Sequence, residues 1–196
     1  MPRFAWPRGG LWRDSDFLRF WAAQTASQVG SQVTQLALPL VAIVVLDAST
    51  FEVALLTVVE FLPWLIVSLP AGVWVDRVRR RPVLVAADVG RALALAWVPL
   101  GAALGVLSVW QLYAVGFVAG SLTVFFDVGY QSYIPSLVGR DRLVDGNSKL
   151  EFTRSAAQIG GPGLGGALIT ALSAPYAILV DAASFVVSAL LLGTIR

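Results

Sequence analysis

The stretch AGVWVDRVRRRP, residues 71–82, concentrates charge in a chain that otherwise contains little of it. Its four arginines, at positions 77, 79, 80 and 81, fall within five residues and directly follow Asp76. The whole chain has 196 residues, of which 57% are hydrophobic and only 13% are charged. Because soluble domains carry about a quarter charged residues, this composition indicates a membrane protein.

Several kinds of chemistry are excluded by the residue types that the chain lacks. It contains neither cysteine nor histidine, which excludes disulfides, thiol catalysis, histidine general bases and zinc sites of the usual kind. A membrane enzyme would then need a facing pair of carboxylates, and the sequence shows no obvious one. We therefore expect a protein that is not an enzyme and that binds no cofactor, no metal and no nucleic acid.

Apolar runs long enough to cross a bilayer follow one another along the chain. A transmembrane helix needs about 20 mainly apolar residues to cross about 30 Å of hydrocarbon. The sequence predicts six such helices, at about 20–46, 53–75, 83–104, 111–134, 150–172 and 176–193. We expect an all-α membrane protein, with a short N-terminal segment at 1–19 and a transmembrane domain at 20–196.

The basic residues lie at alternate ends of these runs. Twelve of the 14 lysines and arginines lie before the first run, between the second and third, between the fourth and fifth, or at the C-terminus. The connections around 47–52, 105–110 and 173–175 contain none. Because basic loops stay in the cytoplasm, this pattern predicts that both termini and the segment 1–19 are cytoplasmic in a multi-pass protein of the cell membrane.

The order of residues in GVWVDRVRRRPVL, residues 72–84, is more particular than a charged loop requires. It resembles the signature that the major facilitator superfamily of transporters carries between its second and third helices. Trp74 stands where a leucine is usual, and Arg79 where a second glycine is usual. The matching positions are Gly72, Asp76, Arg77, Arg80, Arg81 and Leu84.

A second resemblance lies in the predicted fifth helix. AQIGGPGLGGALI, residues 157–169, is similar to the antiporter signature of drug exporters in that superfamily, with matches at Gly161, Pro162, Gly165 and Gly166. Glycines let neighbouring helices approach closely, and an internal proline bends its helix. Residues 125–138 and 177–192 also resemble the fourth and sixth helices of macrolide-exporter-like members, although the arginine typical of the fourth helix of proton antiporters is absent.

The resemblance implies a fold and a function. Members have about twelve helices in two six-helix halves, each built from two inverted three-helix repeats. This chain corresponds to the N-terminal half, with a second half from the same gene or another copy as its partner. The implied function is efflux of small amphipathic, drug-like or macrolide-like compounds by alternating access, coupled to protons. The alternatives are a uniporter or importer, a non-transporting membrane scaffold, and an incomplete fragment without activity alone.

Polar side chains in the first predicted helix form a stripe. Gln24, Gln28, Ser31 and Gln35 are spaced by four, three and four residues, so they share one helical face, and Gln32 flanks them. Lipid cannot satisfy amide groups, so this face should turn toward a cavity or a neighbouring helix. We expect these five residues to line a substrate cavity; the alternative is hydrogen bonding between helices.

Ionisable residues near the predicted cytoplasmic side form a second group. Asp88 and Arg91 are three residues apart, as are Glu151 and Arg154, so each pair shares a helical face. Asp127 should lie at the depth of Arg154. Two interpretations remain open, a structural lattice of charges and a gate that breaks between conformations. The group comprises Gly72, Asp76, Arg77, Arg80, Arg81, Asp88, Arg91, Asp127, Glu151 and Arg154.

Glu60 and Asp181 are predicted to lie in the other half of the membrane, where the sequence places no lysine or arginine. A charge at a helix centre costs about 2.5–3.5 kcal/mol on insertion scales, so an unpaired acid there is neutral or in contact with water. That is the condition for exchanging protons, and both residues are candidates for proton coupling. For Asp181 the alternative is that it reaches the interface from the start of its helix.

Overall fold

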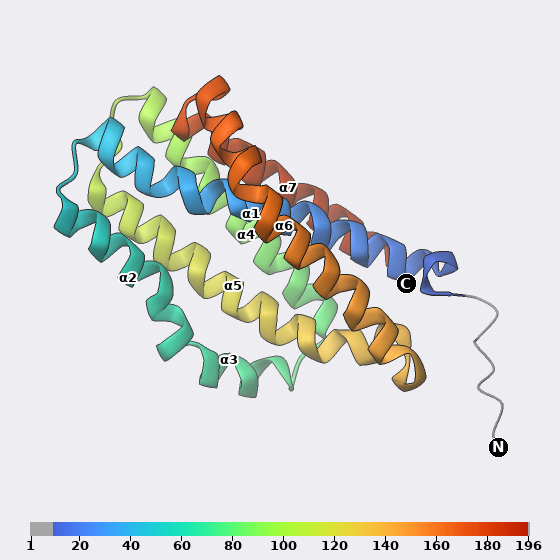
Figure 1. Cartoon of the computed structure of the whole chain (residues 1–196). Coiled ribbons are helices and arrows are strands. Elements are labelled where there is room, and N and C mark those ends of the chain that lie inside the picture. Colours follow the sequence, from blue (N-terminus) through green and yellow to red (C-terminus); the bar gives the residue numbers. More distant parts are fainter. Residues whose placement is uncertain (1–9, 196) are drawn as a thin grey trace, which may run out of the picture.

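The computed structural model describes residues 10–195, and these are helical apart from short connections (Figure 1). A single 3-10 turn, η1 (Leu11–Arg13), precedes the first long helix. The α-helices are α1 (Ser15–Leu46), α2 (Thr50–Ile66), α3 (Ser68–Val75), α4 (Arg80–Ala103), α5 (Val109–Val138), α6 (Leu143–Leu172) and α7 (Ala174–Thr194), and a second 3-10 turn, η2 (Arg140–Arg142), leads into α6.

Side chains at the helix ends explain why the chain turns where it does. The Asp14 carboxylate accepts hydrogen bonds from the backbone N–H groups of Asp16 and Phe17, which caps the start of α1. Ser49 and Glu52 form a reciprocal capping box at the start of α2. Between α6 and α7 a single residue, Ser173, reverses the chain with a positive φ of 71°. Each cap satisfies backbone groups that a helix end leaves free.

The helices form one elongated bundle. Helix α1 packs against α6 and α7, α4 packs against α5 and α7, and α5 also covers α2 and α3. Figure 1 shows the connections after α1, α4 and α6 at one end, and the connections after α3 and α5 at the other, near the start of α1 and the end of α7. The basic connections therefore share one end of the bundle, and the three connections without lysine or arginine share the opposite end.

Apolar side chains fill the interior and also cover much of the surface. One buried cluster includes Leu38, Leu56 and Ile178, and a second, nearer the basic end, includes Phe20 and Phe126. Large apolar side chains are also exposed along the helices, with Leu69 at 81% and Ile159 at 84% of their surface. An apolar exterior of this extent is typical of a protein surrounded by lipid or by other membrane helices.

Four helices, α1, α4, α5 and α7, are long and apolar enough to cross a membrane, and α2 with α3 qualifies as one bent pair. Helix α6 has 30 residues but is not among them. Its five glycines between positions 160 and 166 add little hydropathy, so a length of about 45 Å at 1.5 Å per residue does not by itself mark it as a span. By composition the described residues contain up to five spans, against the six that the sequence predicts.

The prediction of one continuous helix over 53–75 is wrong. Helices α2 and α3 meet at Val67 with a bend of 45°. The proline ring of Pro70 excludes a hydrogen bond to the carbonyl of Ile66 and clashes with it, and Pro63 removes one bond a turn earlier. The break therefore has a local cause in two prolines.

Candidate functional site

The polar stripe of α1 faces two cavities, and its first half lines the larger one. This cavity, called the Arg154 cavity, has a volume of about 270 Å³. Helix α1 contributes Gln24 and Gln28 to its wall. The remaining polar and aromatic lining comprises Thr25, Trp64, Asp127, Tyr130, Gln131, Glu151, Thr153 and Arg154. Amide, hydroxyl and charged groups from α1, α5 and α6 thus meet in one space, beside the Trp64 indole of α2.

The second half of the stripe lines a cavity of about 200 Å³, called the Glu60 cavity. Ser31, Thr34 and Gln35 face it from α1. The charged residues on its wall are Glu60, Arg91 and Asp181, from α2, α4 and α7, and its apolar wall includes Leu38, Phe61, Trp64, Leu95 and Phe185. Trp64 lines both cavities, so the two cavities share this indole as part of their walls.

Gln32 lies elsewhere. A Cβ atom placed on Gly161 of α6 would overlap the Gln32 side chain, and Gln32 lines neither cavity. The structure therefore brings Gln24 and Gln28 to one cavity and Ser31 and Gln35 to the other, and places Gln32 at the contact between α1 and α6.

Glu60 lies where α5 makes its closest approach to α2. A Cβ atom on Gly120 would come within 2.6 Å of the Glu60 carbonyl oxygen, and one on Gly116 within 3.0 Å of the Glu60 Cγ atom. Only glycine fits at this distance without moving one of the helices. The two glycines thus hold the Glu60 side chain between α2 and α5, beside the cavity.

Asp181 does not reach an interface, because its side chain is only 1% exposed. The Ser184 hydroxyl donates a hydrogen bond of 3.1 Å to its Oδ1 atom. Gly30 of α1 approaches so closely that a Cβ atom there would lie 2.5 Å from the same oxygen and 2.3 Å from the Ser184 hydroxyl. The carboxylate is therefore enclosed between α1 and α7, where it lines the Glu60 cavity.

Asp88 and Arg91 form an ion pair on one face of α4, with exposed fractions of 0% and 4%. The Ser188 hydroxyl donates to Asp88 Oδ2 at 2.6 Å. The guanidinium carbon of Arg91 lies 4.4 Å from the Phe126 ring centre and 4.1 Å from the Phe185 ring centre. Arg91 is thus held by a carboxylate and by two aromatic rings, interactions that compensate a buried cation for its lost hydration.

The position of Arg91 corrects the expectation that no basic residue reaches the level of Glu60 and Asp181. All three side chains line the Glu60 cavity. Arg91 lies eleven residues after Arg80, about 16 Å along α4 at 1.5 Å per residue, and therefore near the middle of that helix. Glu60 lies about 15 Å along α2 by the same count. Because α2 and α4 start at opposite ends of the bundle, Glu60 and Arg91 lie at similar depth.

The other members of the predicted charge lattice are placed differently. Asp127, Glu151 and Arg154 line one cavity, but within residues 10–195 none of them forms a direct ion pair, and neither does Asp76. Asp76 directly follows the last residue of α3, and Arg79 precedes α4 with a φ of −68°, so the loop of the signature needs no glycine at position 79.

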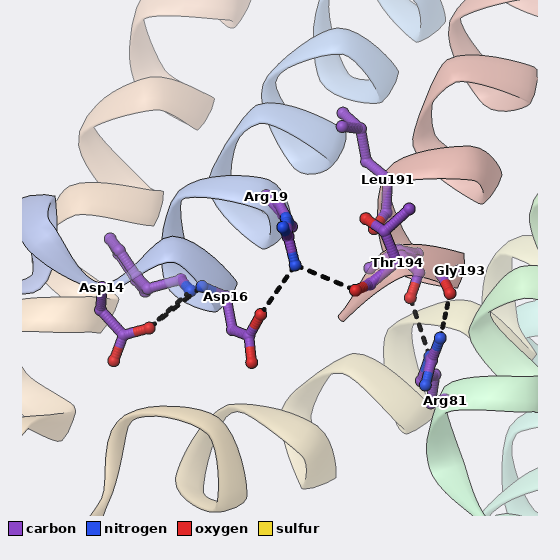
Figure 2. Close-up of polar contacts among 9 residues, drawn as sticks. Asp14, Asp16, Arg19, Arg81, Leu191, Gly193 and Thr194 are labelled. Carbon is purple, nitrogen blue, oxygen red and sulfur yellow. Dashed lines mark hydrogen bonds and ion pairs between the residues drawn. The ribbon is translucent and has the colours of Figure 1, made fainter. Parts of the chain in front are cut away.

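Arg81, from the same signature, binds the end of α7 instead of Asp76. Its guanidinium donates to the backbone carbonyls of Leu192, at 2.9 Å, and of Gly193. Arg19 of α1 donates to the carbonyl of Thr194 at 3.0 Å and to Asp16 at 3.2 Å (Figure 2). Two cations thus satisfy carbonyl groups at the negative end of the α7 dipole and fix that end to α1 and α4.

The glycines of the predicted antiporter signature divide between two faces of α6. Gly161 and Gly165 are buried against α1, where added Cβ atoms would meet Gln32, Leu36 and Val33. A Cβ atom on Gly166 would meet nothing within 4 Å, and Pro162 lies inside the helix without ending it. One face of the glycine segment therefore packs on the polar helix, and the other is open.

A family model and several individual proteins match this chain. The model of a family described as transmembrane secretion effectors matches residues 11–196, nearly the whole chain. This chain belongs to that family of major facilitator transporters. The predicted membership is confirmed, and the members of this family that match the chain are transporters, not enzymes, as expected.

Individual transporters resemble the chain at low identity. It is 30% identical over 185 residues to the multidrug efflux pump Tap of Mycolicibacterium fortuitum, which covers 91% of the chain and 44% of Tap. It is 28% identical over 171 residues to the uncharacterized MFS-type transporter YfiS of Bacillus subtilis, covering 87% and 40%. Macrolide efflux protein A of Streptococcus pyogenes is 23% identical over 180 residues, covering 92% and 44%. The chain spans less than half the length of these relatives, and no solved structure matches it significantly.

Several residues that line the two cavities or contact their charged groups were not singled out in the sequence. Trp64 and Phe185 had no charge or periodicity to mark them, and Ser184 and Ser188 lie in a helix that reads as apolar. Gly30, Gly116 and Gly120 are isolated glycines inside predicted helices, which usually indicates a close approach of another element. That signal was present, but it does not identify the partner helix.

Proposed function

We propose that this chain forms the N-terminal six-helix half of a proton-coupled exporter of small amphipathic compounds. In this proposal α2 and α3 form one bent span, α6 forms another, and α1–α4 and α5–α7 are the two inverted three-helix repeats within a domain that begins near residue 20. The observation that carries the proposal is that amides of α1 and the two carboxylates of Glu60 and Asp181 line adjoining cavities.

The groups on the cavity walls suit the two tasks of such an exporter. Gln24, Gln28 and Gln35 offer donors and acceptors that fix the orientation of a substrate, while Trp64 offers an apolar surface. Glu60 and Asp181 are carboxyl groups that can take up and release protons. A second six-helix half would close both cavities, and rocking of the halves would expose them to the two sides of the membrane in turn.

The relatives support the direction of transport that we propose. Two of the three are named as efflux proteins, one for multiple drugs and one for macrolides. We take the same class, small amphipathic compounds, as the substrates of the complete gene product that carries this chain. Protons and the lipid bilayer are its other proposed partners.

Transport by the complete gene product in proteoliposomes tests this function. We expect an amphipathic dye to be driven across the membrane by an imposed pH gradient, and the movement to stop when a protonophore collapses that gradient. Dye movement that is equally fast without the gradient would instead indicate a uniporter. No movement above protein-free liposomes, from protein that is folded and correctly inserted, would favour a membrane scaffold.

The proposed orientation can be tested with cysteines, because the native chain has none. Ser49 and Ser173 are exposed at the end of the bundle without basic connections, and Ser148 is exposed on α6 near the other end. We expect Ser49→Cys and Ser173→Cys to react with a membrane-impermeant maleimide in intact cells, and Ser148→Cys to react only after lysis. Labelling of Ser148→Cys in intact cells at the rate seen for Ser49→Cys would reverse the orientation.

A further inference from the structure

The wall of the Arg154 cavity carries polar side chains of two kinds, and the first kind is already bound within the protein. The Thr25 hydroxyl donates a hydrogen bond of 2.7 Å to the carbonyl of Trp21. The Thr153 hydroxyl donates to the carbonyl of Lys149 at 3.1 Å and accepts from the Trp21 indole at 2.9 Å. These two hydroxyls join α1 to α6 and need no partner from the cavity.

The second kind consists of amides without a partner, and Gln24 is the clearest of them. Its side chain is only 8% exposed and lines the cavity, yet its amide forms no hydrogen bond within residues 10–195. Gln28 and Gln131 line the same cavity, and among the described residues their amides are also free. Because an amide that is buried without a hydrogen bond is unfavourable, Gln24 calls for a polar partner inside the cavity.

The charged groups of this cavity are also left without partners. Glu151 and Arg154 are three residues apart on α6, the same spacing as Asp88 and Arg91 on α4, but only the α4 pair forms an ion pair. Within residues 10–195 Arg154 is not paired with Asp127 of α5 either. One guanidinium and two carboxylates therefore remain available to a ligand on the cavity wall.

Charges of both signs on one wall favour a ligand that carries both signs. The guanidinium of Arg154 matches the two oxygens of a ligand carboxylate, and a carboxylate on the wall matches a ligand ammonium group. Glu151 is exposed, so water can solvate it, whereas Asp127 is half-buried and is the better partner for the ammonium group. A ligand with a single charge would leave either Arg154 or Asp127 without a counter-charge.

The size and the apolar part of the wall limit the ligand further. The cavity volume of about 270 Å³ lies near the lower end of small-molecule pockets, which begin at about 300 Å³. Trp64 and Leu150 supply the apolar wall, and the indole can stack on an aromatic ring. A compound of the size of an aromatic amino acid fits this space.

We propose that the Arg154 cavity binds amphipathic zwitterions of the size of an aromatic amino acid. Arg154 binds the ligand carboxylate, Asp127 binds its ammonium group, and the Gln24 amide completes the polar contacts. This inference rests on the proposed function and deepens it, since it names a substrate class and the residues that select it. The binding needs no proton exchange and can be measured without transport.

The test compares three labelled probes that share a phenyl ring and differ in their charged groups. Phenylalanine has both groups, phenethylamine lacks the carboxylate, and 3-phenylpropanoate lacks the ammonium group. Binding is measured at neutral pH by equilibrium dialysis against the complete gene product in phosphatidylcholine nanodiscs, with protein-free nanodiscs to correct for partition into lipid. We expect phenylalanine to bind with a Kd about tenfold lower than either other probe, the worth of one charged hydrogen bond.

Matched variants assign the two charged contacts separately. Arg154→Gln should weaken phenylalanine and 3-phenylpropanoate by about tenfold without weakening phenethylamine. Asp127→Asn should weaken phenylalanine and phenethylamine by the same factor without weakening 3-phenylpropanoate. Arg140→Gln and Asp141→Asn make the same chemical changes at exposed positions of η2 outside the cavity, so they should bind all three probes as wild type.

Several results would overturn the zwitterion site. If wild type binds the three probes equally, binds phenethylamine most tightly, or binds none above protein-free nanodiscs, the site is excluded even where the variants fail to fold. If Arg154→Gln weakens all three probes alike, Arg154 supports the fold and does not bind the carboxylate.

The outcomes also separate this inference from the proposed function. Proton-driven export of a neutral dye without binding of phenylalanine would leave the exporter intact and remove only the zwitterion site. Binding of phenylalanine with the expected preference, but without transport of any compound, would keep the site and exclude the exporter.

Discussion

Export driven by a proton gradient should stop when Glu60 is replaced by glutamine in the complete gene product, while a neutral substrate should still bind. Glutamine has the size of glutamate but cannot release a proton. Glu60 lies about 15 Å along α2 and lines a cavity, so its carboxyl group can meet water only when the cavity opens. A residue in that position couples proton movement to the change of access, and its loss should uncouple the two.

The measurement compares dye movement with and without an imposed pH gradient for wild type and Glu60→Gln. Glu52→Gln serves as the control, with the same chemical change in the same helix. Gln28→Ala and Gln35→Ala should show the opposite pattern, since they remove amides from the cavity walls and leave the carboxyl groups in place. We expect them to weaken substrate binding by about tenfold, the worth of one or two hydrogen bonds, without loss of coupling.

The competing interpretation is that Glu60 pairs with a basic residue of the second half and never takes up a proton. In that case Glu60→Gln would lower the stability of the assembled transporter and leave coupling intact. Gradient-driven export at the wild-type rate in folded Glu60→Gln would therefore exclude Glu60 as the coupling residue and leave Asp181 as the remaining candidate.

Replacement of Arg91 by methionine should destabilise the fold by about 3–5 kcal/mol, the usual cost of removing one partner of a buried ion pair. Methionine fills a similar volume but leaves the fully buried Asp88 carboxylate with only the Ser188 hydroxyl. It also removes the cation from between the rings of Phe126 and Phe185. Unfolding of the purified protein in mixed micelles by increasing SDS measures the change.

The double variant Asp88→Asn, Arg91→Met provides the control. Removing both charges leaves no uncompensated carboxylate, so this variant should recover much of the lost stability. If the double variant is as unstable as Arg91→Met alone, the loss comes from the packing between the two rings and not from the ion pair.

The sequence by itself determined the class of the protein and the approximate positions of most of its helices. Runs of apolar residues predicted helices where α1, α4, α5 and α7 lie, because the hydropathy of a segment depends on its own residues. The alternation of basic and non-basic connections likewise matches the two ends of the bundle. The stripe from Gln24 to Gln35 was visible because residues three and four apart share a face of any helix. Even the bend at Val67 has its cause in the local sequence, at Pro70.

Only the tertiary structure decided which of these groups meet. Whether Gln32 faces a cavity or Gly161, and whether Arg91 lies beside Asp127 or beside Glu60 and Asp181, depends on the rotation of each helix about its axis and its shift along that axis. Close approaches at Gly30, Gly116 and Gly120 set that rotation and shift, and each involves two segments far apart in the chain. Periodicity fixes which side chains share a face of one helix, but contact between helices decides what that face meets.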